Sequence, residues 1–220
     1  MVLNIYSVDP KLVGYDASLQ LVFALITFLL AYYAWKVSKL GNQRAAKRMS
    51  ISFLLISVSY AILSLFNFLI IGQLNAGLPK MQLVGKIILF NGLGLYFQIV
   101  FMIAGLALFT HTSLNMQRMR VFWLLFLLCL AALHFGKTLF LSFLLAAILL
   151  LFTTYHYVEH YRKKKSTTAL LICLAFGFWC LAKINYLFLM YNQIFYHIGN
   201  AFELISFLLF LYTLYLIRKQ

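Results

Sequence analysis

Two charged residues, Lys183 and Glu203, lie deep inside long apolar stretches of the sequence. A charge within the hydrocarbon core of a bilayer is costly, so such residues are rare and often belong to a functional site. Each lies about seven residues from the nearer end of its stretch, which is roughly 10 Å along a helix. Elements joined by a short connection usually pack together. We therefore predict that the two side chains meet as an ion pair inside a helix bundle.

Three amide side chains accompany this pair: Asn91, Gln98 and Asn200. Asn91 and Asn200 lie early in their apolar stretches, and the three-residue step from Asn200 to Glu203 puts both on one helix face. With Lys183 and Glu203, these amides predict a polar pocket that opens outward and binds a small molecule. The alternative is structural. Amides often only bridge membrane helices, at about 0.6 kcal/mol each, and the charged pair would then be a structural salt bridge.

A second motif, His156-x-x-Glu159-His160, has the H-x-x-E-H pattern. Histidines at positions i and i+4 share a helix face and can bind zinc. His111 ends another apolar stretch on the same side and would be a third ligand. This arrangement would make the chain a membrane-embedded, metal-dependent hydrolase. However, the motif runs directly into the basic run 162–165, whose charges would oppose a bound dication. We therefore expect a protein that is not an enzyme and needs no cofactor.

Membrane-spanning helices must position these residues. Hydrophobic residues make up 65% of the 220 positions and charged residues 10%, whereas soluble domains are about half apolar and a quarter charged. Lipid cannot satisfy free backbone groups, so such a chain crosses the bilayer as helices of about 20 residues. We predict an all-α, seven-helix bundle that forms a single transmembrane domain over residues 1–220. The predicted helices are 17–36, 51–72, 86–111, 120–136, 138–157, 167–190 and 196–217.

The basic residues predict the orientation of this bundle, because lysine and arginine concentrate in cytoplasmic loops. Thirteen of the 18 follow the first, third, fifth and seventh predicted helices. The N-terminus is therefore expected outside and the C-terminus in the cytoplasm of a prokaryotic-type cell membrane. The net charge of +14 is explained by this asymmetry, so we expect no nucleic-acid partner. The lipid bilayer is the main partner, and anionic headgroups would bind the basic loops at about 1 kcal/mol per charge.

A faint internal similarity links the second and sixth predicted helices: 54–57 reads Leu-Leu-Ile-Ser, and 170–173 reads Leu-Leu-Ile-Cys. Asparagines follow both segments, at Asn67 and Asn185. The similarity indicates a 3+1+3 arrangement with the fourth helix as linker, as in some transporters built from parallel repeats. Chance similarity between two apolar helices is the alternative.

In topology and length, this layout resembles small seven-helix membrane proteins. These include the sugar-transporting SWEET proteins, microbial rhodopsins and the N-terminal sensors of some histidine kinases. The resemblance implies transport or sensing of a small molecule. The chain departs from rhodopsins because 196–217 holds no lysine that could bind retinal. It departs from SWEET proteins because its two prolines, Pro10 and Pro79, do not form a proline–glutamine motif. An accessory or scaffold subunit is a third alternative, and homo- or hetero-oligomerisation stays open.

Overall fold

The computed structural model describes residues 10–41, 44–75, 80–114, 119–134 and 138–219, and almost all of them are helical. No strand occurs among these residues, which confirms the all-α prediction. The α-helices in this part of the chain are α1 (Pro10–Gly41), α2 (Arg44–Asn75), α3 (Lys80–Ser113), α4 (Met119–His134), α5 (Thr138–Lys164), α6 (Thr167–Leu187) and α7 (Ile194–Lys219). A 3₁₀ turn, η2 (Phe188–Met190), follows α6.

Six of these helices, all except α4, are long and apolar enough to cross a membrane. Their length and composition are consistent with the predicted helical membrane protein. With 16 residues, α4 is about 24 Å long at 1.5 Å per residue, somewhat short of a hydrocarbon core of about 30 Å. The seven-span count and the orientation of the termini stay predictions.

Most helices extend past the apolar stretches from which they were predicted. The segments 37–50 and 73–85 were expected to be loops, but α1 continues to Gly41, α2 runs from Arg44 to Asn75 and α3 starts at Lys80. Lysine, arginine and glutamine are good helix formers, so the backbone stays helical where the sequence turns polar. Hydropathy detects only the part of a helix that suits lipid, and it therefore missed the polar ends.

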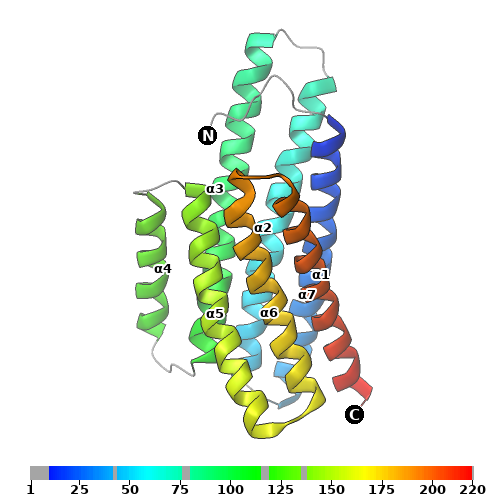
Figure 1. Ribbon diagram of the computed structural model, residues 1–220, viewed down its shortest axis with the longest axis vertical. Coiled ribbons are helices and arrows are strands. Elements are labelled where there is room, and N and C mark those ends of the chain that lie inside the picture. The colour runs from blue at the N-terminus through cyan, green and yellow to red at the C-terminus, as the bar shows by residue number, and fades with distance from the viewer. Residues whose placement is uncertain (1–9, 42–43, 76–79, 115–118, 135–137, 220) are drawn as a thin grey trace.

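The helices contact one another in the order α1, α2, α3, α5, α6 and α7, and a contact between α1 and α7 closes the ring (Figure 1). The short helix α4 lies outside this ring against α3 and α5. Figure 1 shows α3 and α5 running in the same direction, so α4 carries the chain from one end of the bundle to the other. We name the two ends the α5–α6 end and the α6–α7 end, after the connections found there.

The ring consists of two three-helix units, α1–α3 and α5–α7, which contact each other through α3 with α5 and α7 with α1. In the first unit, serines spaced by seven residues on α2 donate hydrogen bonds of 2.7–2.8 Å to alanine carbonyls of α1: Ser50 to Ala31, Ser57 to Ala24 and Ser64 to Ala17. In the second unit, Cys180 of α6 donates to the carbonyl of Ala147 on α5 at 3.6 Å. Ser64 and Cys180 correspond under the same alignment that pairs 54–57 with 170–173. This equivalence favours the 3+1+3 interpretation.

Aromatic side chains fill the middle of the ring. Trp179 of α6 has no exposed surface. Its ring centroid lies within 6.4 Å of the rings of Phe109, Phe176, Phe207 and Phe210. These rings come from α3, α6 and α7, so a single core joins the two units. The polar groups described next lie on this core.

Candidate functional site

The local structure of α6 and α7 places the predicted pair. The chain leaves α6 through η2 and enters α7 after a short turn, where Asn192 Oδ1 accepts a hydrogen bond from the Ile194 amide at 2.9 Å. Because the connection is short, the two helices pack side by side. A Cβ atom at Gly199 would collide with the ring of Tyr186, so the glycine lets that ring lie directly on the α7 backbone.

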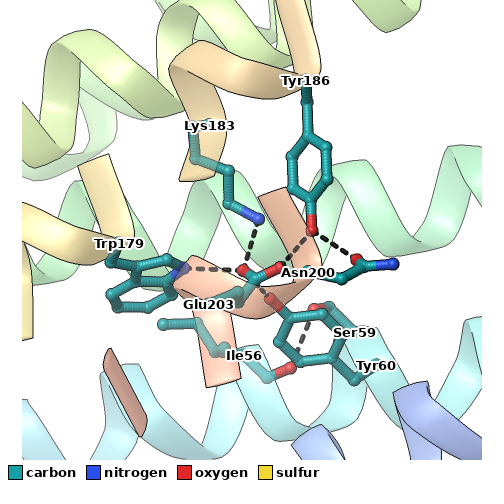
Figure 2. Close-up of polar contacts among 8 residues, drawn as sticks. All are labelled: Ile56, Ser59, Tyr60, Trp179, Lys183, Tyr186, Asn200 and Glu203. Atoms are coloured by element: carbon teal, nitrogen blue, oxygen red, sulfur yellow. Dashed lines mark hydrogen bonds and ion pairs between the residues drawn. The ribbon is translucent and has the colours of Figure 1, made fainter. Parts of the chain in front are cut away.

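Lys183 and Glu203 form the ion pair that the sequence predicts. The Lys183 Nζ atom lies 2.6 Å from Glu203 Oε1 (Figure 2). The two residues are only 4% and 2% exposed, respectively. The prediction that they meet inside the bundle is therefore confirmed, whereas a ligand-binding role stays a prediction.

Four donors surround the Glu203 carboxylate, as Figure 2 shows. Oε1 accepts hydrogen bonds from the Tyr60 hydroxyl, from Trp179 Nε1 at 2.8 Å and from Lys183 Nζ at 2.6 Å. Oε2 accepts from the Tyr186 hydroxyl at 2.8 Å. A buried carboxylate is tolerated when its lone pairs are used in this way. We call the set Tyr60, Trp179, Lys183, Tyr186, Asn200 and Glu203 the Glu203 cluster.

Aromatic rings also surround the Lys183 ammonium. Nζ lies 5.1 Å from the ring centroid of Tyr186 and 5.9 Å from that of Tyr60. A cation within about 6 Å of an aromatic face is attracted by the ring electrons. The ammonium therefore lies between a carboxylate and two aromatic rings. This environment would suit the cationic group of a small molecule as well as it suits lysine.

Sequence reasoning missed Tyr60, Trp179 and Tyr186, although each donates to Glu203. A signal was present in their position. Tyr60 and Trp179 lie near the middle of their apolar stretches, whereas membrane aromatics with polar atoms concentrate at the interfaces. A tyrosine or tryptophan at mid-depth needs a hydrogen-bond acceptor. The sequence holds only 4 acidic residues, so Glu203 was an available partner.

Of the predicted pocket residues, Lys183, Asn200 and Glu203 come together, but Asn91 and Gln98 do not join them. The latter two are half-buried on α3, which packs on α2, α4 and α5. In the part of the chain that the structure describes, no hydrogen bond links either amide to the Glu203 cluster. The depth of a residue along its helix can be read from sequence, but its direction around the helix axis and the place of that helix in the ring cannot.

The residues of the predicted metal site lie toward the α5–α6 end. Glu159 is exposed on α5 and pairs with Lys163 at 2.7 Å, while His111 is buried on α3 with its ring 6.3 Å from that of Phe122. Over the described ranges, no three His, Cys, Asp or Glu side chains are placed to hold a metal ion. The hypothesis built on His156, Glu159 and His160 therefore gains no support from the geometry.

A cavity of about 270 Å³ lies elsewhere, between α3, α4 and α5. Its walls are almost entirely apolar and include Cys129, Leu145, Leu149 and Phe152. None of its lining residues belongs to the Glu203 cluster. Thr110 and His111 also line it, but almost no polar surface faces the space. This cavity is therefore separate from the Glu203 cluster.

The Glu203 cluster brings a carboxylate, an ammonium, two phenols and an amide together where little water can enter. Such a set can bind a charged or polar small molecule, because each group can exchange its present partner for a ligand atom. No family model, curated protein or solved structure matches this chain. The chemistry of this site is therefore the basis for assigning a function to the chain.

Proposed function

We propose that this chain is a seven-span membrane protein that binds a small polar molecule at the Glu203 cluster, for transport or for sensing. One observation carries the proposal: the cluster bridges the two three-helix units. Tyr60 comes from the α1–α3 unit, whereas Lys183 and Glu203 come from the α5–α7 unit. Sites at the interface between repeats are where secondary transporters bind their substrates. A movement of one unit against the other would separate Tyr60 from Glu203 and leave the ion pair intact.

The energetics also favour a functional role. A buried ion pair is often no more stabilising than apolar residues of the same volume, because both charges lose their hydration. The surrounding core is built from phenylalanine and tryptophan, and apolar side chains of this kind could also have filled the positions of Lys183 and Glu203. Charged groups inside a membrane are usually retained for binding or relay. The alternative is a structural ion pair in an accessory or scaffold subunit, and the complete set of donors around the carboxylate is compatible with it.

The proposed topology has α4 as the seventh crossing, with the α5–α6 end in the cytoplasm and the α6–α7 end outside. Support comes from the parallel course of α3 and α5, which requires α4 to return the chain to the other end. It also comes from the basic residues, because Lys39, Arg44 and Lys163 lie on helix ends toward the α5–α6 end. Those residues would contact anionic headgroups of a prokaryotic-type cell membrane.

Cysteine labelling tests this topology. In a variant lacking Cys129, Cys173 and Cys180, Thr167→Cys and Gln193→Cys place single exposed thiols at opposite ends of α6 and of the bundle. In intact cells, an impermeant thiol reagent should label Gln193→Cys and spare Thr167→Cys. After the cells are broken, both should react. Labelling of Thr167→Cys in intact cells would contradict the orientation.

The same reagent tests whether the site opens. Asn200 is 7% exposed and lies on the outer side of Glu203, so a thiol in Asn200→Cys is reachable only when the two units separate. We expect it to react in intact cells, more slowly than Gln193→Cys. Ser206→Cys is the matched control, because Ser206 lies one turn beyond Glu203 on α7 and has no exposed surface. If Asn200→Cys is as inert as Ser206→Cys, the cluster is a structural ion pair and the ligand-binding proposal is wrong.

A further inference from the structure

We propose that Glu203 also binds a proton, at its Oε2 atom, and that Tyr186 and Asn200 change their hydrogen bonds to accept it. The proton would be the coupling ion of the small-molecule site, so this inference rests on the proposed function. It is carried by the distances around the Tyr186 hydroxyl. Membrane proteins use buried carboxylates as proton carriers in this way.

The two oxygens of Glu203 have different surroundings. Oε1 receives three donors, from Tyr60, Trp179 and Lys183, so its lone pairs are used. Oε2 receives a single hydrogen bond, from Tyr186. A proton placed on Oε1 would point toward one of these donors, which include the Lys183 ammonium at 2.6 Å. An added proton therefore belongs on Oε2, where only a hydroxyl oxygen faces it.

The Tyr186 hydroxyl lies between two acceptors. Its oxygen is 2.8 Å from Glu203 Oε2 and 2.6 Å from Asn200 Oδ1, but a phenol has one proton to donate. If Tyr186 donates to Asn200, the contact with Glu203 needs a proton on Oε2, which then donates to the phenol oxygen. If Tyr186 donates to Glu203, the amide of Asn200 must turn so that Nδ2 faces the phenol. Amide orientations of this kind are set by the network around them.

Both arrangements use the same heavy-atom positions. In the ionised arrangement, Asn200 Nδ2 donates to Tyr186, and Tyr186 donates to the Glu203 carboxylate. Uptake of one proton at Oε2 reverses the chain, so that Glu203 donates to Tyr186 and Tyr186 donates to Asn200 Oδ1. In the orientation of the structure, Oδ1 faces the Tyr186 hydroxyl, as the protonated arrangement requires. Nδ2 makes no hydrogen bond of 3.5 Å or less among the described residues, and Tyr196 is the further side chain that interacts with Asn200. One covalent bond forms, the O–H bond at Oε2, while the Tyr186 O–H bond rotates to its new acceptor and the Asn200 amide turns.

Charged and titratable groups approach this site from each neighbouring helix. Tyr60 faces it from α2, and Lys183 faces it from α6. From α1, Asp16 interacts with Tyr196, which lies one helical turn before Asn200 on α7 and interacts with its side chain. Exposed His197 is next to Tyr196. Proton uptake would leave the Lys183–Glu203 pair with a net positive charge. The pair would then hold together less strongly, which links protonation to opening of the site.

Infrared spectroscopy tests this inference directly, because the chain has only 4 acidic residues. In a variant with Asp9→Asn, Asp16→Asn and Glu159→Gln, Glu203 is the sole side-chain carboxyl. Acidification of this variant should produce the C=O band of one protonated side-chain carboxyl per chain. The band should vanish in alkaline buffer and be absent when Glu203→Gln is added. The terminal carboxyl is common to both proteins and cancels in the difference.

Replacing Asn200 tests the switch itself. In Asn200→Leu, the protonated arrangement leaves the Tyr186 hydroxyl without an acceptor, whereas the ionised arrangement keeps its hydrogen bond to Glu203. A buried donor without a partner is unfavourable. The band should therefore need about tenfold more acid to appear, and a tenfold change corresponds to about 1.4 kcal/mol. An unchanged titration would overturn the role of Asn200 and Tyr186.

The outcomes separate this inference from the proposed function. If Glu203 never shows the band at any pH at which the helical circular dichroism persists, proton binding is wrong. Labelling of Asn200→Cys in intact cells would still support the small-molecule site. If the band appears but Asn200→Cys never labels, Glu203 binds a proton in a protein that does not open. The proton would then not be a coupling ion, and that part of the inference would fall.

Discussion

Glu203→Gln should lower the free energy of unfolding by about 3–5 kcal/mol, the usual result of breaking a buried ion pair by removing one partner. The loss arises because the Lys183 ammonium stays buried at 4% exposure and no longer has a carboxylate within reach. The two neighbouring tyrosine rings compensate only in part. Thermal unfolding of the purified protein in detergent, followed by circular dichroism, measures the change.

Lys183→Met should cost less than Glu203→Gln. Without the ammonium, the Glu203 carboxylate still accepts hydrogen bonds from Tyr60, Trp179 and Tyr186. If the Lys183 ammonium could reach the membrane interface, Glu203→Gln would cost less than Lys183→Met, because no unpaired charge would stay buried. However, Lys183 is buried and directed at Glu203 (Figure 2).

The double variant with Lys183→Met and Glu203→Gln should recover much of the loss, because neither charge is then left alone. Residues in direct contact give non-additive changes in stability, and residues that do not interact give additive ones. Additive losses would therefore mean that the pair contributes nothing as a pair. An exposed ion pair serves as the control. Glu159→Gln removes the partner of Lys163 at the end of α5 and should leave stability nearly unchanged, because water already solvates both charges.

Trp179→Ala should also destabilise the bundle by about 3–5 kcal/mol, the range for removing a large buried aromatic side chain. The indole is completely buried among phenylalanine rings from α3, α6 and α7. Its loss leaves a cavity at the point where the two units share their core. Trp123→Ala is the matched control, because Trp123 is 55% exposed on the peripheral helix α4. Equal losses in the two variants would contradict the central position of Trp179.

Trp179→Phe separates packing from hydrogen bonding at the same position. The phenyl ring fills most of the space of the indole but cannot donate a hydrogen bond to Glu203. In the wild type, Trp179 Nε1 donates to Glu203 Oε1 at 2.8 Å. A hydrogen bond to a charged group contributes about 1.5–3 kcal/mol. We expect Trp179→Phe to fall between the wild type and Trp179→Ala. A loss as large as that of Trp179→Ala would mean that the hydrogen bond carries the whole effect.

The sequence by itself determined the class of the protein and the pairing at its centre. A chain that is 65% hydrophobic suits a lipid environment, where backbone N–H and C=O groups must hydrogen-bond within the protein. Membrane helices meet this requirement, so the sequence predicts them directly. Lys183 and Glu203 could be paired from sequence because they lie at similar depth on helices joined by a short connection. Depth is a one-dimensional quantity, and residue counting measures it well.

Only the tertiary structure decided which further side chains surround Glu203. Tyr60 lies 143 residues from it in the chain and reaches it because α1 packs on α7 and closes the ring. Asn91 and Gln98 were expected nearby on grounds of depth, yet α3 lies across the ring from α7. The order of helices around a bundle depends on how their faces pack together. Those faces are almost uniformly apolar here, so the sequence carries little trace of that order.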